Sequence, residues 1–294
     1  MIKVNITKNH NKFFILSAAL MVICVVALLF GGLNLGIDFK GGTIVQVDLN
    51  QSFETEDIRE FSDKFDESAD ITYAGEERSQ MILSTSVDLS ESQRAQFLDD
   101  LAGKFNIDQK EDLLSIDNVS ATVGGELKQQ SLLAVVVAIL AMLIYISFRF
   151  EPLFGLAAVI ALIHDVVIVL GVYAILGIQV NTPFIAAILT ILGYSINDTI
   201  VVFDRIRENR SKYKKYDFEN LVDDSIHQTL RRSINTTLTT VIAIGALYAV
   251  GVQSIKDFTL PMIVGFLSGT YSSIFVASSI WFVLKNRKRH PAKR

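Results

Sequence analysis

Six long apolar runs dominate the pattern of hydrophobic and polar positions along the chain. They cover residues 13–33, 131–148, 153–178, 184–203, 234–251 and 260–284. A helix needs about 20 mainly apolar residues to cross a hydrocarbon core of about 30 Å. The pattern therefore predicts six transmembrane helices. The first run could instead be a signal peptide, but no small-residue cleavage site follows it, so we interpret it as an uncleaved helix.

Residues 34–127 follow a different pattern. Short stretches of strand character occur near residues 43–49, 71–73, 80–86 and 115–123, and helical spacing occurs at 54–65 and 90–105. Ser90 is a plausible N-cap of the second helix. The order strand, helix, strand, strand, helix, strand is that of the ferredoxin-like split βαβ fold. We therefore predict an α-helical membrane protein with one small α+β domain between its first and second spans.

The charges are distributed unevenly along the chain. Residues 34–127 hold 21 acidic and 7 basic residues, whereas residues 205–232 hold eight Lys or Arg and residues 285–294 hold six. Lys and Arg accumulate in cytoplasmic loops. The pattern predicts a multi-pass membrane protein with both termini in the cytoplasm and the acidic domain outside. The expected parts are 1–33 (N-terminus and first span), 34–127 (external domain), 128–284 (spans two to six, with the loop 205–232) and 285–294 (basic tail).

The loop 205–232 has apolar residues at helical spacing: Phe218, Leu221, Val222, Ile226 and Leu230. This spacing predicts an amphipathic helix, either along the membrane face or against a neighbouring element. Contact of its basic residues with lipid is an alternative.

Among the polar residues inside the apolar runs, we single out His164, Asp165, Asn197 and Asp198. An ionisable group in the bilayer costs several kcal/mol and usually faces a bundle interior or a water path. A functional role is therefore one hypothesis for these residues. The alternative is that they hold helices together by hydrogen bonds.

Asp198 is our candidate proton carrier. Burial raises the pKa of a carboxyl group and a nearby cation lowers it, so the two together can bring a membrane aspartate close to proton exchange. Antiparallel packing of the fourth and fifth spans would place Arg232 near Asp198, although Arg232 could instead extend to the membrane interface. His164 and Asp165 are further relay candidates or an internal hydrogen-bonded pair.

Small residues suggest close packing at two places. Gly265, Gly269 and Ser273 repeat at every fourth position of the sixth span, which lets a helix from this chain or another protein approach closely. In the sequence GIDFKGGT, Asp38, Gly41 and Gly42 mark where the chain enters the external domain. We predict a glycine turn beside a close-packed backbone there; anion binding is the alternative.

Several function classes are disfavoured. The single cysteine, Cys24, excludes an intrachain disulfide, and no Cys/His cluster, phosphate-binding loop or nucleotide fingerprint is present. We expect no bound cofactor, no metal, no nucleic-acid partner and no enzymatic activity. Energy would come from an ion gradient or from a partner.

Four motifs resemble the SecF family of bacterial protein-export subunits. They are GIDFKGGT (36–43), VSATVGGEL (119–127), HDV (164–166) and GYSINDTIVVFDRIREN (193–209), and the run SINTTLTT (233–240) supports them. The resemblance covers nearly the whole chain. The short external region favours SecF over SecD or a fused SecDF.

The resemblance implies an RND-superfamily bundle, of which this chain supplies one six-helix half. It implies a place in the bacterial plasma membrane, an obligate SecD partner, use of the proton-motive force, and help in drawing a translocating polypeptide out of the SecYEG channel. The family's membrane aspartate and arginine correspond to Asp198 and Arg232, whereas no role is assigned to His164 or Asp165. Two other hypotheses stay open, a proton-coupled exporter of small molecules and a structural module that carries no protons.

Overall fold

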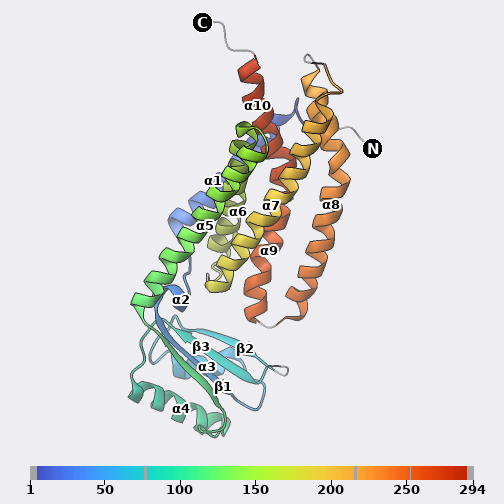
Figure 1. The fold of residues 1–294 in the computed structure, drawn as a ribbon. Helices are drawn as coiled ribbons and strands as arrows, with labels where there is room; N and C mark the ends of the chain where they lie inside the picture. The colour runs from blue at the N-terminus through green and yellow to red at the C-terminus, as the bar shows by residue number, and fades with distance from the viewer. Residues whose placement is uncertain (1–4, 76–77, 215–216, 252, 290–294) are drawn as a thin grey trace.

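The computed structural model describes residues 5–75, 78–214, 217–251 and 253–289. Within them, six helices are long and apolar enough to cross a membrane, which confirms the predicted number. They form one bundle, and the sheet domain lies beyond one end of it (Figure 1). The spans are α1 (His10–Gly31), α5 (Ala121–Arg149), α6 (Pro152–Leu176), α7 (Thr182–Asn209), α8 (Phe218–Val250) and a last span made of α9 (Gln253–Tyr271), η1 (Ser272–Ala277) and α10 (Ser278–Arg289). Residues 1–4 and 290–294, part of the predicted basic ends, lie outside the described residues.

The interior of the bundle is built by α6, α7 and the last span. In an 18-residue apolar stretch of each of these spans, 50–61% of the residues are buried inside the protein, against 6–11% in α1, α5 and α8. Small residues make this close packing possible. A Cβ on Gly265 would lie 2.4 Å from Ile191 of α7, and one on Gly269 would lie 2.9 Å from Ser195. The predicted small-residue stripe therefore packs against a span of the same chain.

The external domain contains a four-stranded antiparallel sheet with strand order β2-β3-β1-β4. This order, with two helices on one face, is the predicted ferredoxin-like arrangement. Val45, Val47, Met81 and Leu83 alternate along β1 and β3 and bury their side chains beneath the helices. The elements are β1 (Gly42–Asp48), α3 (Thr55–Ser62), β2 (Asp70–Ala74), β3 (Gln80–Thr85), α4 (Glu91–Phe105) and β4 (Leu113–Val119). Ser90 caps α4 as predicted, and Gln93 completes a capping box.

Two helices begin ten or more residues earlier than the apolar runs indicate. α5 starts at Ala121, ten residues before the predicted position, because Ser120 accepts the N–H of Val123 and starts the helix in a polar stretch. The amphipathic segment is the first part of α8 and continues directly into the fifth span. Its Phe218 ring lies 5.5 Å from that of Trp281 on α10. Of the two predicted positions for this segment, the structure therefore shows packing against a neighbour.

The glycine segment contains a short helix, α2 (Ile37–Lys40), which the sequence pattern did not indicate. Gly41 and Gly42 follow with φ of 83° and 143°. A Cβ on Gly41 would lie 2.7 Å from the backbone nitrogen of Ala121, and one on Gly42 would lie 2.0 Å from the carbonyl oxygen of Thr85. The predicted turn beside a close-packed backbone is confirmed. Asp38 fixes this turn to the bundle by accepting the N–H of Thr182 at 2.8 Å.

Candidate functional site

Asp198 lies in the interior of the bundle, on the part of α7 that crosses the membrane. It is eleven residues from the end of α7, or about 16 Å along a helix that rises about 1.5 Å per residue. Its side chain is 8% exposed. Oδ1 accepts a hydrogen bond from the Ser233 hydroxyl of α8 at 2.6 Å, and the buried Oδ2 has no hydrogen-bond partner among the described residues. A carboxyl group with one bonded and one open oxygen is well placed to accept a proton.

Neither of the two residues predicted to act beside Asp198 bonds to it among the described residues. Arg232 is exposed and forms no ion pair with Asp198, but its charge lies close enough to act electrostatically on the carboxyl group. Asn197 is also exposed, because adjacent residues of a helix point about 100° apart and burial of Asp198 turns Asn197 outward. The residue that does contact the aspartate, Ser233, was missed. Ser233 is 0% exposed, but burial alone does not single it out, because Thr237 one turn later is also buried and bonds to Thr270 instead.

Asp165 of α6 forms a second polar centre in the same bundle. Oδ2 accepts hydrogen bonds from the hydroxyls of Ser195 and Ser272, both at 2.7 Å, and Oδ1 accepts one from Ser268 at 2.8 Å. Nδ1 of His164 lies 3.2 Å from Oδ1. Asp165 is 0% exposed, so these serines replace the water that would otherwise solvate it. The predicted internal pairing of His164 and Asp165 is present, and three serines from two other spans extend it.

Serine and threonine hydroxyls connect the regions around the two aspartates. Thr199 and Ser273 share a hydrogen bond of 2.7 Å, and Ser273 also donates to the carbonyl of Ser195 at 3.2 Å. Ser272 and Ser273 begin the π-helical turn η1, and the hydroxyl of Ser278 reaches the carbonyl of Ser273, five residues back. π-Helical turns interrupt regular helices and are frequent at functional sites. Here the turn faces both α6 and α7.

The threonines of α8 do not reach Asp198. Thr236, Thr239 and Thr240 donate to carbonyls of their own helix, and Thr237 pairs with Thr270 of α9. Residue spacing alone did not show whether these threonines bond to their own helix or to Asp198.

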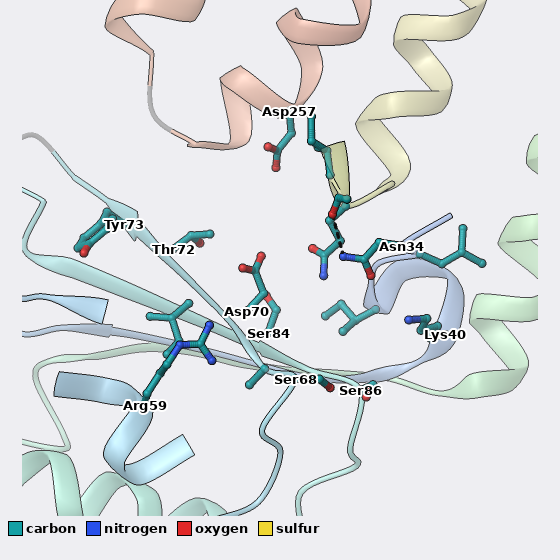
Figure 2. A pocket seen from close by; sticks show the side chains of 17 residues that line it. Asn34, Lys40, Arg59, Ser68, Asp70, Thr72, Tyr73, Ser84, Ser86 and Asp257 are labelled. Atoms are coloured by element: carbon teal, nitrogen blue, oxygen red, sulfur yellow. Dashed lines mark hydrogen bonds between the residues drawn. The ribbon is translucent and has the colours of Figure 1, made fainter. Parts of the chain in front are cut away.

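A cavity of about 540 Å³ separates the sheet domain from the near end of the bundle. Figure 2 shows Asp70 of β2 and Asp257 of α9 on opposite sides of it, with Arg59 and Lys40 at its edge. Burial raises the pKa of Asp70, and the charge of Arg59 opposes part of that rise. The cavity is polar and lies outside the bundle.

Comparisons with known proteins agree with this architecture. The family described as "Protein export membrane protein SecD/SecF, C-terminal" matches residues 102–287, and the "SecD/SecF GG Motif" matches residues 26–52. The chain belongs to the SecD/SecF family. The second match contains the turn formed by Asp38, Gly41 and Gly42, and the first contains both aspartate centres.

Individual members of the SecD/SecF family are similar over nearly the whole chain. The protein translocase subunit SecF of Sebaldella termitidis is 37% identical, covering 97% of this chain and 92% of that protein. SecF of Acidaminococcus fermentans is 39% identical, covering 98% and 99%. SecDF of Bacillus subtilis is 37% identical, but only 39% of that longer protein is covered.

A solved structure has the same fold. The crystal structure of SecDF from Thermus, described as a translocon-associated membrane protein, matches with a TM-score of 0.83 and 35% identity. The match covers 97% of this chain and 39% of that one. This SecD/SecF-family chain is therefore a multi-pass membrane protein, and its fold matches one part of the longer SecDF chain.

Proposed function

We propose that this chain is the SecF-type membrane subunit of a protein-export complex, in which proton transfer at Asp198 drives conformational change. It would act with a SecD-type partner to draw polypeptides out of a SecYEG channel, on the side of the membrane that holds the sheet domain. No bound cofactor enters this proposal, because the proton gradient supplies the energy. A charge moving through 100 mV contributes about 2.3 kcal/mol, enough to shift a two-state equilibrium.

One observation carries the proton-transfer part of the proposal: the bundle buries the Asp198 carboxyl with one oxygen unpartnered among the described residues. A carboxyl that served only to join helices would be expected to have both oxygens bonded, as Asp165 has. The contrast suggests that Asp198 exchanges its proton and that Asp165 maintains the packing of α6, α7 and the last span. Arg232 lies next to Ser233 along α8, within electrostatic range of Asp198, and we propose that it comes into direct contact with Asp198 in another conformation.

The outer surface of the bundle supports the need for a partner. Asn197 on α7 and Asn235, Thr236 and Thr239 on α8 are exposed, although they lie in membrane spans. Polar side chains in hydrocarbon normally face another helix or a water-filled space. A Cβ added to Gly193, one turn before Asn197, would meet no described atom within 4 Å, so a partner helix can approach there. This chain covers only 39% of each SecDF protein, so the remainder of SecDF is long enough to contain a second helix bundle.

The orientation belongs to the same proposal. The start of α1 and the end of α10 lie at the end of the bundle opposite the sheet domain (Figure 1). The connection between α7 and α8, which carries basic residues such as Arg210 and Lys212, lies at that end too (Figure 1), so we infer from the positive-inside rule that this end faces the cytoplasm. The similar proteins are named as translocase subunits, which gives the small-molecule exporter hypothesis no support.

The test is export of a secreted precursor in bacteria whose only copy of this chain carries Asp198→Asn. Asp204→Asn is the matched control, because Asp204 lies on the same helix, is 40% exposed and pairs with Arg207. We expect Asp198→Asn to slow export at least tenfold with membrane level and partner binding unchanged, and Asp204→Asn to have little effect. Normal export with Asp198→Asn would refute proton transfer at this residue.

A further inference from the structure

A second cavity, of about 250 Å³, lies at the end of the bundle opposite the sheet domain. Four segments meet around it: the end of α5, the start of α6, the end of α7 and α10. Its lining consists of Arg149, Phe150, Glu151, Phe154, Ile206, Arg207, Arg210 and Trp281. Three arginines next to the aromatic rings of Phe150, Phe154 and Trp281 are an unusual lining for a cavity at the edge of a membrane bundle, where charges are costly.

The Phe150 ring holds two of these arginines in place. The guanidinium carbon of Arg149 lies 5.5 Å from the ring centroid, and that of Arg207 lies 5.1 Å from it. Cation–π contacts of this kind fix a guanidinium without neutralising it. Arg207 also pairs with Asp204 at 3.0 Å, whereas Arg149 has no carboxylate within ion-pair distance in the described part of the chain. Arg149 therefore presents an uncompensated charge.

The carboxylate that lines the cavity, Glu151, is already bonded to two cations. It accepts hydrogen bonds from Arg210 and from Lys285 of α10. Partial burial raises the pKa of Glu151, but these two hydrogen bonds outweigh it and the pKa is lowered, so the group stays ionised. Together with their ion-pair partners, the charged groups at the cavity are two carboxylates, Glu151 and Asp204, and four cations: Arg149, Arg207, Arg210 and Lys285. The cavity thus keeps a positive field that an anion would neutralise.

A buried donor without a partner adds an independent indication of a ligand. Trp281 is 2% exposed and stacks on Phe154, with ring centroids 4.4 Å apart. Its indole N–H is buried and has no hydrogen-bond partner among the described residues. A buried N–H without an acceptor is unfavourable, because it has lost its hydrogen bond to water. Trp281 lines the cavity, so an oxygen-rich ligand there is the nearest candidate acceptor for this N–H once the surrounding side chains adjust to it.

The surroundings indicate which anion reaches the cavity. The neighbouring face of α5 is apolar and exposed, with Ile144 68% and Phe148 94% accessible, so acyl chains would cover it. The arginines begin one residue after Phe148, at the depth where headgroups replace acyl chains. Guanidinium groups bind phosphate through paired N–H donors. Basic pockets between spans at this level suit phospholipid headgroups.

We propose that this cavity binds the phosphate of an anionic phospholipid, held by Arg149 and Arg207 and covering Trp281. The proposal rests on the chain being a membrane protein and not on proton transfer at Asp198. The same phosphate chemistry could be met by free inorganic phosphate, and the acidic segment of a partner protein is another occupant. The experiment distinguishes the phospholipid, free phosphate and a protein segment as occupants of the cavity.

The chain provides its own probe, because Trp281 is its only tryptophan. The full-length chain is placed in phosphatidylcholine nanodiscs that contain a small, equal fraction of either phosphatidylglycerol or phosphatidylcholine with brominated acyl chains. Bromine quenches tryptophan fluorescence only at short range. We expect quenching by the brominated phosphatidylglycerol to be several-fold stronger. The difference should disappear in the double variant Arg149→Gln/Arg207→Gln.

Arg205→Gln is the matched control, because Arg205 is close in sequence, pairs with Glu208 at 2.9 Å and does not line the cavity. It should keep the headgroup preference. If the double variant misfolds, as judged by circular dichroism, the single variant Arg149→Gln takes its place, because Arg149 is exposed. Equal quenching by both lipids in the wild type, or a preference unchanged by the variants, would overturn the proposal and favour a protein occupant. Loss of the preference on adding inorganic phosphate, with a shift in Trp281 emission by phosphate alone, would assign the site to free phosphate instead.

Discussion

The hydroxyl of Ser233 on α8 donates a hydrogen bond of 2.6 Å to Oδ1 of Asp198 on α7, and the other carboxyl oxygen has no partner in the described part of the chain. This contact links the buried aspartate to the helix that also carries Arg232. Any movement of α8 relative to α7 would change the environment of the carboxyl. The pair is therefore the point at which protonation and helix movement can affect each other.

Ser233→Ala should impair function through this contact. Removal of the hydroxyl takes away the hydrogen bond to Oδ1 of Asp198, at a cost of about 1–3 kcal/mol. We expect export to slow about tenfold at equal membrane level. Ser279→Ala is the control, because the Ser279 hydroxyl is buried without any partner among the described residues and its loss should be neutral or stabilising. Equal export by the two variants would show that the Ser233 contact has no role in the cycle.

Ser195, Ser268 and Ser272, the three serines that bond to Asp165, should contribute to stability jointly and not independently. Ser195 and Ser272 both donate to Oδ2 at 2.7 Å, so either serine can still serve the oxygen when the other is removed. Each single change to alanine should cost about 0.6–1.7 kcal/mol, the range for hydrogen bonds between membrane helices. The double variant should lose more than the sum, because Oδ2 is then buried without a donor. Unfolding of the purified chain in detergent measures this. Additive losses would argue against a shared role, and Ser278→Ala, whose hydroxyl bonds its own helix, sets the baseline.

The glycine at the contact between α9 and α7 should not tolerate a methyl group. A Cβ on Gly269 would lie 2.9 Å from Cβ of Ser195 and would displace the serine that donates to Asp165. Gly269→Ala should therefore destabilise the chain by about 1–3 kcal/mol. Gly245→Ala, where no described atom lies within 4 Å, should instead stabilise it by up to about 1 kcal/mol through helix propensity. Thermal unfolding of the chain alone compares them, and similar values for both would contradict the packing argument.

The external domain should weaken in acid because of Asp66. Burial raises the pKa of this carboxyl, but hydrogen bonds from Ser68, Thr85 and Ser86 outweigh it and lower the pKa. A lowered folded-state pKa stabilises the fold at pH values above the unfolded value of about 3.9. That stability is lost as the pH falls through the folded-state pKa.

Hydrogen exchange of the β2 and β3 amides in the full chain, corrected for intrinsic rates, measures this effect. Protection should fall below about pH 4 in the wild type. In Asp66→Asn it should be lower at neutral pH, by about 1 kcal/mol, and less dependent on acid, with the remaining dependence due to groups such as Asp48, whose pKa is also lowered by its hydrogen bonds. Thr85→Val, which removes one donor at 2.6 Å, should give an intermediate result. An acid dependence in Asp66→Asn as large as in the wild type would show that Asp66 does not contribute to it.

The sequence was most informative where one physical requirement dominates. Six apolar runs predicted six spans, because only a helix satisfies its backbone in hydrocarbon. Alternation in 43–49 predicted β1, and Gly41 and Gly42 were explained by close packing that leaves no room for a side chain. Helix starts were less certain. The polar residues that begin α5 carry no hydrophobic signal, and cap geometry at Ser120 sets the boundary.

The buried site was only partly predictable. Asp165 and Asp198 stand out because carboxyl groups are rare in apolar runs, but their partners are serines, which are common in membrane helices. Which serine faces an aspartate depends on helix rotation and on the π-helical turn at Ser272–Ala277, and neither can be read from spacing. The same limit applies to Asn197, which is adjacent to Asp198 in sequence and faces the opposite environment.

That outward position of Asn197 leads to a prediction about the partner. If the polar face formed by Asn197, Asn235 and Thr239 is covered by a second bundle, a cysteine placed there should react with the partner chain. Asn197→Cys is a clean probe, because Cys24 is the only native cysteine and is buried. We expect a short bifunctional thiol cross-linker to join Asn197→Cys to a scanning set of cysteines on the partner's corresponding helix. Ile160→Cys, also exposed but on α6, should give no such product. Cross-linking from Ile160→Cys and none from Asn197→Cys would place the partner on another face of the bundle and leave the exposed asparagine without an explanation.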